Sequence, residues 1–267
     1  MQPNTRPLPI TRNLSPACAL SLVIALLMTA ASLAGLLFPA SLYPTEALRR
    51  TFLANDVVNL FIGLPILLTS MWAARNGSAL GLLFWPGALF YSLYNYIAYA
   101  VAMPLTAPFV VYLALAGLSA FGLLRLITSL DAPAIQRHLA GAVPARLAGG
   151  VLAGLGALFF LRAIGQIVSA PAGPELAVLV ADLLTTPFWV AGGILLWRRQ
   201  ALGYAAGLGL LFQGSMLFVA LLVFFILQPF VTGAPFPLTD FMVIAVMGLV
   251  CFAPFGLFVR GVLKSST

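Results

Sequence analysis

Long apolar segments follow one another along almost the whole chain, and they constrain its fold more than any other feature. Each is about 20 residues long, the length that an α-helix needs to cross the hydrocarbon core of a bilayer. Only 7% of the residues are charged and 62% are hydrophobic, whereas a soluble domain carries about 25% charged residues. The apolar runs are continuous rather than alternating, which argues against a β-barrel. The sequence therefore predicts an all-α, polytopic integral membrane protein.

Eight apolar segments are separated by turn-forming residues. We place them at residues 18–38, 52–74, 79–103, 109–130, 147–169, 175–197, 202–228 and 238–260. We expect 1–267 to form a single membrane domain with possible halves 17–130 and 147–263, joined by a cytoplasmic connection at 131–146. Basic residues precede the first segment, as in a signal peptide, but its apolar run of about 21 residues favours a retained helix.

Basic residues predict the orientation of this eight-helix bundle. With the N-terminus inside, only Arg49 and Arg50 fall outside, and Arg162 falls within the fifth segment. The remaining basic residues fall inside: Arg6, Arg12, Arg75, Arg125, Arg137, Arg146, Arg198, Arg199, Arg260 and Lys264. Because positive residues collect in cytoplasmic loops, we expect an N-in/C-in topology. The net charge of +7 then reflects orientation and not a nucleic-acid partner.

The second and sixth segments share a pattern that suggests an internal duplication. Asp56 precedes Trp72 by 16 residues, Asp182 precedes Trp197 by 15, and an arginine follows each tryptophan. Two halves of four spans that enter from the same side would form a parallel 4+4 repeat, as in some transporters. The alternative is that tryptophan beside arginine simply marks the membrane interface.

A resemblance accompanies this pattern. The stretch Asp56–Pro65 (DVVNLFIGLP), the turn at 75–78 (RNGS) and the run Tyr91–Tyr99 (YSLYNYIAY) resemble a family of bacterial multi-pass membrane proteins of unknown function. The second-half residues from Asp182 to Tyr204 are similar to the same family. The resemblance supports a multi-pass fold and the duplicated motifs, and it implies no ligand, cofactor or reaction.

Polar side chains recur in the outer half of several predicted spans. At 1.5 Å per helical residue, the deepest of them lie about 6–12 Å below the outer ends of their helices. Neighbours at spacings of three and four residues share a helix face with them. The candidate ligand-binding residues are Asp56, Asn59, Tyr91, Asn95, Tyr99, Arg162, Gln166, Asp182 and Thr186.

These polar residues have two interpretations, because ionisable groups inside a bilayer face a wet cavity or pair with one another. One is an outward-facing pocket in which Arg162 is the cation and Asp56 and Asp182 are the anions. The other is a structural network in which Arg162 pairs with one aspartate and the amides and hydroxyls bind helices together.

Further polar residues have simpler interpretations. Tyr94 and Tyr96 either line the pocket with their neighbouring tyrosines or belong to an interfacial belt. Gln213 is expected to form a hydrogen bond between helices. Glu175 and Asp240 start predicted helices, where the helix dipole favours a carboxylate.

No catalytic or cofactor motif accompanies the pocket. The single histidine, His138, lies in the cytoplasmic connection, and Cys18 and Cys251 do not form a ligand pair, so no metal or other cofactor is expected. We expect a protein that binds or transports a small amphipathic molecule or lipid. The alternatives are an intramembrane enzyme acting on a lipid through Asp56 or Asp182, which is less favoured, and a structural or assembly partner in a membrane complex. Membrane lipids are the expected partners. Arginine exceeds lysine, and alanine, glycine and leucine are abundant, a composition typical of GC-rich bacteria that suggests a bacterial plasma membrane.

Overall fold

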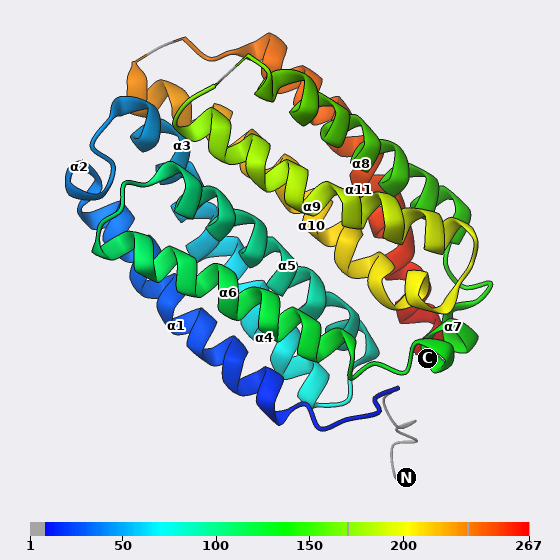
Figure 1. The fold of residues 1–267 in the computed structure, drawn as a ribbon. Helices are drawn as coiled ribbons and strands as arrows, with labels where there is room; N and C mark the ends of the chain where they lie inside the picture. Colours follow the sequence, from blue (N-terminus) through cyan, green and yellow to red (C-terminus); the bar gives the residue numbers. More distant parts are fainter. Residues whose placement is uncertain (1–8, 170, 234, 267) are drawn as a thin grey trace.

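The chain folds into a bundle of long helices. A computed structural model describes residues 9–169, 171–233 and 235–266. Figure 1 shows the long helices running side by side, with the first described residues and the end of the last helix at the same end of the bundle. The helices are α1 (Ser15–Leu37), α2 (Pro39–Leu42), α3 (Glu46–Val58), η1 (Asn59–Gly63), α4 (Leu64–Arg75), α5 (Ala79–Ala102), α6 (Ala107–Ile127), α7 (Ala132–Leu139), α8 (Ala145–Ile167), α9 (Pro174–Trp197), α10 (Ala201–Thr232) and α11 (Leu238–Ser266). The described residues form no strand, and one isolated bridge joins Ile10 to Leu130.

Seven helical stretches in the described chain are long and apolar enough to cross a membrane, so the prediction of a multi-pass helical protein is confirmed in that form. The third predicted segment, 79–103, corresponds to α5. This helix has 24 residues but is not among the seven, since tyrosines and Asn95 lower its hydropathy. Most of α5 is buried, so its polar residues face other helices instead of lipid.

Helix boundaries differ from the predicted segments where polar residues continue a helix. The second predicted segment, 52–74, belongs to one continuous helical stretch that begins at Glu46. Thr45 caps its N-terminus, because its side chain accepts a hydrogen bond from the Leu48 N–H and so satisfies a free donor of the first turn. The seventh and eighth predicted segments also continue further, to Thr232 and Ser266.

A π-helical segment, η1, interrupts the continuous stretch between α3 and α4. Single π-turns inside α-helices are rare and often occur at functional sites. This segment begins at Asn59, one turn after Asp56, and Pro65 follows it at the start of α4. The irregular turn therefore lies beside two of the candidate residues.

The contacts between helices divide the bundle into two parts, α1 to α6 and α8 to α11. Within the first part α1 packs on α4 and α6, and α5 packs on both α4 and α6. In the second part α8 packs on α9 and α11, and α10 packs on both α9 and α11. The two parts meet mainly through α5, which contacts α9 and α10.

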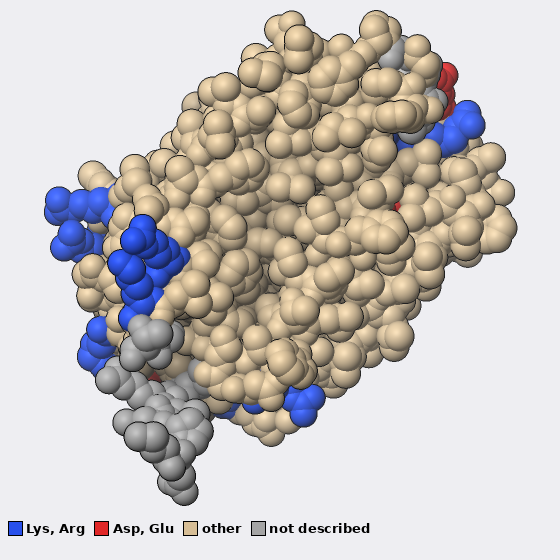
Figure 2. Space-filling model, turned by 180° about the vertical axis from the view of Figure 1, so that it is seen from behind, with Lys and Arg blue, Asp and Glu red and all other residues tan. Residues whose placement is uncertain are grey.

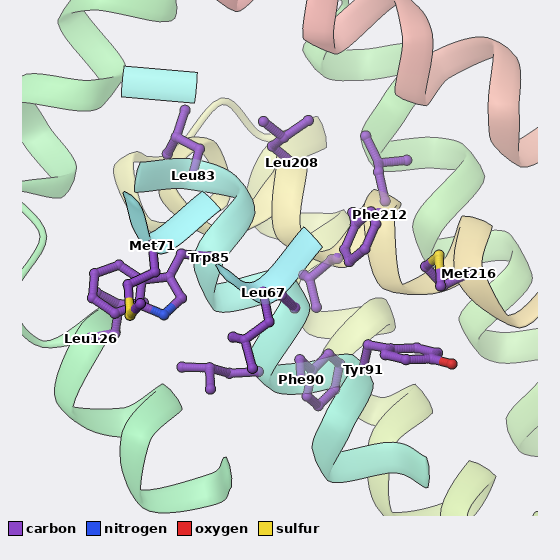
Figure 3. Close-up of a cluster of buried hydrophobic side chains, with 14 of the residues drawn as sticks. Leu67, Met71, Leu83, Trp85, Phe90, Tyr91, Leu126, Leu208, Phe212 and Met216 are labelled. Carbon is purple, nitrogen blue, oxygen red and sulfur yellow. The ribbon is translucent and has the colours of Figure 1, made fainter. Parts of the chain in front are cut away.

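The contact between α5 and α10 depends on two glycines. A Cβ added at Gly87 would lie 2.6 Å from the Gly209 Cα, so neither position accepts a side chain without movement of a backbone. Figure 3 shows the apolar side chains around this contact, contributed by α4, α5, α6 and α10. Trp85 is fully buried there, and its indole N–H donates to Ser21 Oγ of α1 at 2.8 Å.

The connection predicted at 131–146 contains a short amphipathic helix, α7, that the sequence reading missed. Asp131 caps it by accepting a hydrogen bond from the Ala134 N–H at 3.0 Å. Ile135 and Leu139 are buried beneath it. The segment is therefore packed against the end of the bundle and is not an open loop.

Charged side chains concentrate at the two ends of the bundle. Figure 2 shows basic residues gathered at the end that carries the chain termini, with a smaller charged group at the other end and an uncharged flank between them. The helix ends agree, since Arg75, Arg125 and Lys264 lie in last turns at the terminal end. Arg6 belongs to the predicted inner set but lies outside the described residues.

Candidate functional site

A cavity of about 620 Å³ opens between the two parts of the bundle. Its walls come from α3, α5, α8, α9 and α10 and include Thr51 and Asn55 of α3 and Glu175 of α9. These residues place it in the half of the bundle that lies away from α7. Four predicted site residues line it: Asn95, Arg162, Gln166 and Asp182.

Asp182 supplies a carboxylate at the cavity wall. It is 2% exposed, and the Tyr94 hydroxyl of α5 donates to its Oδ1 at 3.0 Å. Thr186 is buried one turn later and donates to the Asp182 backbone carbonyl at 2.8 Å. The Tyr94–Asp182 hydrogen bond therefore joins the two parts of the bundle at the cavity.

Arg162 and Gln166 lie one turn apart on α8 and line the cavity from the side opposite α5. Both are exposed. Within the described residues the ion pair closer than 4.0 Å is Arg50–Glu46, at the end of the bundle. Direct pairing of Arg162 with an aspartate, which the structural-network interpretation requires, is not seen.

Apolar side chains form the remainder of the cavity. Leu217, Leu221 and Phe224 of α10 and Phe159 of α8 line it beside the polar groups. The cavity therefore offers a guanidinium, carboxylates and amides on one part of its surface and a hydrophobic wall on another.

Asp56 does not line this cavity. It is 1% exposed and lies in a separate cluster between α1, α3 and α5. Tyr43 donates to its Oδ2 at 2.5 Å, and Tyr99 donates to its Oδ1 at 2.8 Å. Gly35 of α1 makes the close approach possible, because a Cβ there would contact Asp56 Oδ2.

Tyr43 is a functional candidate that the sequence reading missed. It lies in the connection between α2 and α3 and is fully buried. Burial, and then the nearby Asp56 carboxyl, raise the pKa of the Tyr43 phenol. Its hydroxyl therefore keeps its proton and acts as a donor. No sequence signal marked it, since the residue lies outside every predicted span.

The Asp56 cluster contains several buried polar atoms without hydrogen bonds. Asn59 accepts from the Tyr91 hydroxyl at 2.9 Å, but its Nδ2 has no partner among the described residues. The same holds for Ser32 Oγ and the Tyr96 hydroxyl, which are fully or almost fully buried. Buried polar atoms are rarely left unpaired, so this cluster has unused capacity for hydrogen bonds.

The predicted site residues thus separate into two groups, and their assignment to ligand binding stays a prediction. Asn95, Arg162, Gln166 and Asp182 line the cavity, with Thr186 behind Asp182. Asp56, Asn59, Tyr91 and Tyr99 form the other group. Similar depth alone could not reveal the division, because it does not say which side of α3 and α5 each residue occupies.

Gln213 has the role expected from the sequence. It is fully buried in α10, and its side-chain oxygen accepts a hydrogen bond from the Trp189 indole of α9. Glu175 and Asp240 lie in the first turns of α9 and α11, as predicted. No group of three or more metal-binding side chains occurs within the described part of the chain.

Comparison with known proteins gives no assignment. No family model, no curated protein and no solved structure matches this chain.

Proposed function

We propose that the protein binds or transports a small amphipathic molecule or lipid through the cavity between the two parts of the bundle. The observation that carries the proposal is the combination of Arg162 and Asp182 in the walls of one 620 Å³ cavity without a direct ion pair. Ligand sites are typically concavities of about 300–1,000 Å³ with few polar groups in a mainly apolar lining. A charged pair that served only to hold helices together would be in contact.

The chemistry of the lining suggests how such a molecule binds. The Arg162 guanidinium is permanently charged and suits an anionic or strongly polar head. Asp182 is held in place by Tyr94 and accepts donors from the same head. Leu217, Leu221 and Phe224 contact the apolar portion. A structural or assembly role is the weaker candidate, because the cavity is open and its cation lacks a direct carboxylate partner.

The proposal includes a membrane arrangement. We propose eight spans, with α5 as the central polar one, in a bacterial plasma membrane with both termini in the cytoplasm. The basic end of the bundle then faces the cytoplasm, as positive-inside orientation requires, and the cavity opens outward. The similar helix contacts in 17–130 and 147–263 support a parallel 4+4 repeat, with the cavity at the contact between the halves.

Retention of bound molecules tests the function. The protein is purified in lipid nanodiscs, and non-covalently bound molecules are identified by mass spectrometry. We expect an amphipathic molecule that Arg162→Gln and Asp182→Asn lose. Arg146→Gln is the matched control on the same helix, since Arg146 lies in the first turn of α8. Equal retention by all variants would contradict the site, provided that each variant elutes as a folded protein.

Accessibility of single cysteines tests the topology. In a background without native cysteines, Asn76→Cys and Leu105→Cys are placed at opposite ends of α5, where both positions are exposed. A membrane-impermeant maleimide added to intact cells is expected to label position 105 and not position 76. The reverse pattern would overturn the orientation.

A further inference from the structure

Asp56 is a buried carboxyl group that lacks a cationic partner. No ion pair within 4.0 Å reaches it among the described residues. The titratable and hydroxyl groups around it are Tyr43 from the α2–α3 connection, Tyr91, Tyr96 and Tyr99 from α5, Tyr112 from α6 and Ser32 from α1. All of these groups are neutral hydroxyls.

No basic residue of the described chain forms an ion pair with Asp56. Arg50 pairs with Glu46 at the start of α3, and no hydrogen bond or ion pair joins Arg49 to Asp56 in the described chain. Arg162 lines the cavity and faces Asp182. An isolated carboxylate in an apolar interior is costly and normally takes up a proton instead.

The packing leaves room for a proton and not for a metal ion. Asp56 Oδ2 lies against Gly35 so closely that even a methyl group on that glycine would collide with it. Both carboxyl oxygens already have phenol partners at 2.5 and 2.8 Å. A neutral carboxyl needs one acceptor for its own proton, and Ser32 Oγ is buried beside both Asp56 and the Tyr96 hydroxyl without a formed hydrogen bond.

Phe52 connects this carboxyl group to the cavity. Phe52 is one of the residues that line the cavity, and its side chain is fully buried. Its ring stacks on Tyr43 and is tilted against Tyr99, with ring centroids 6.0 and 4.4 Å apart. Tyr99 also contacts the Phe52 carbonyl at 3.3 Å. The same residue therefore borders the cavity, and its ring packs against the two phenols that hold Asp56.

We infer that Asp56 is a proton-binding site, separated from the cavity by Phe52. Proton uptake converts the carboxylate to a carboxylic acid whose hydroxyl donates to Ser32; the proton comes from a hydronium ion in the cavity, which is left as water. Movement of the Phe52 ring when the cavity fills would couple proton exchange to occupancy. The coupling step rests on the proposed function, whereas the proton site itself does not.

Solid-state NMR of the full chain in liposomes, with aspartate carboxyls labelled with ¹³C, tests the proton site without any cavity ligand. We expect a neutral-carboxyl signal at pH 7 that Asp56→Asn removes. Asp131→Asn, a matched change at the cap of α7, should keep it. If the Asp56 signal is that of an ionised carboxylate, the inference is wrong, whatever the fate of the proposed transport function.

Phe52→Ala tests the separation. Opening the covering ring should admit cavity water, so that the Asp56 signal shifts to the ionised form at pH 7 while the other aspartate signals stay unchanged. Phe52→Leu keeps an apolar side chain over the phenols, so the neutral Asp56 signal is expected to persist. This variant is measured in place of Phe52→Ala if the alanine variant does not fold. A neutral signal in folded Phe52→Ala, or an ionised one in Phe52→Leu, would overturn the role of Phe52.

Discussion

Replacement of Gly35 by alanine measures how tightly α1 packs on the Asp56 cluster. The added Cβ would lie 2.8 Å from Asp56 Cγ and contact the hydroxyl of Tyr43. Carbon atoms in ordinary contact are at least about 3.5 Å apart, so Asp56 Cγ must move by at least roughly 0.7 Å. Asp56 Oδ2 lies closer still and must move further. That movement disturbs two hydrogen bonds, at 2.5 and 2.8 Å.

The expected change in the free energy of unfolding of Gly35→Ala is the difference between two opposing contributions. Overpacking of an interior costs about 1–3 kcal/mol, and replacing a helical glycine by alanine returns about 0.5–1 kcal/mol. The added Cβ meets both a carboxyl and a phenol, so the cost lies in the upper part of that range, about 2–3 kcal/mol, and the net loss in the free energy of unfolding is about 1–2.5 kcal/mol. At about 2–4 °C per kcal/mol for a chain of this size, the apparent Tm of Gly35→Ala should fall by about 2–10 °C.

Gly117→Ala is the matched control for this prediction. Gly117 lies in the middle of α6, and a Cβ there would meet no atom within 4 Å. Its apparent Tm should stay constant or rise slightly, because only the helix preference changes. Thermal unfolding of both variants in the same detergent compares them directly. Equal behaviour of the two variants would refute the close packing of Gly35 on Asp56.

Three further variants test other contacts. Gly209→Val should lower the apparent Tm more than Gly35→Ala, because a Cβ at Gly209 would lie 2.9 Å from the backbone nitrogen of Gly87; a folded protein with normal Tm would contradict the close crossing of α5 and α10. Tyr94→Phe removes the hydrogen bond to Asp182 and should lower the free energy of unfolding by about 0.5–1.5 kcal/mol. Denaturant unfolding in micelles measures this loss, and an unchanged free energy would contradict the hydrogen bond. Arg50→Gln breaks an exposed ion pair and should change stability by less than about 1 kcal/mol, so a larger loss would show that the pair matters more than its exposure suggests.

Much of the fold is predictable from the sequence because the bilayer imposes a length and an apolar composition on each span. The first segment, predicted at 18–38, corresponds closely to Ser15–Leu37, and 175–197 corresponds to Pro174–Trp197. The start of the second helix was predicted too late, since Glu46, Arg49 and Arg50 are polar although they continue the helix. Hydropathy indicates which residues favour lipid. It does not detect helical turns that continue beyond the apolar part of a helix.

The candidate site was harder to predict, because it depends on which helices are neighbours. The sequence placed Asp56 and Arg162 at similar depth, but only Arg162 lines the cavity, and Asp56 belongs to a separate cluster. Tyr94 and Tyr99 lie on the same helix and serve different carboxyls, Asp182 and Asp56. Helical spacing shows that these tyrosines occupy different faces of α5. The packing of the bundle is needed to show which helix each face contacts.

The π-helical turn at Asn59–Gly63 affects how many residues this span contains. A π-turn holds an extra residue relative to an α-helix, and each residue rotates an α-helix by about 100°. The wide turn takes up this extra residue, so deletion of one residue within Asn59–Gly63 would leave a regular α-helix with Asp56 still directed at the phenols of Tyr43 and Tyr99. Deletion of one residue from the regular turns between Asp56 and the segment would instead rotate Asp56 by about 100°. Natural variants of this chain that retain the buried carboxyl should thus tolerate a single-residue deletion within the segment more readily than one elsewhere in the span.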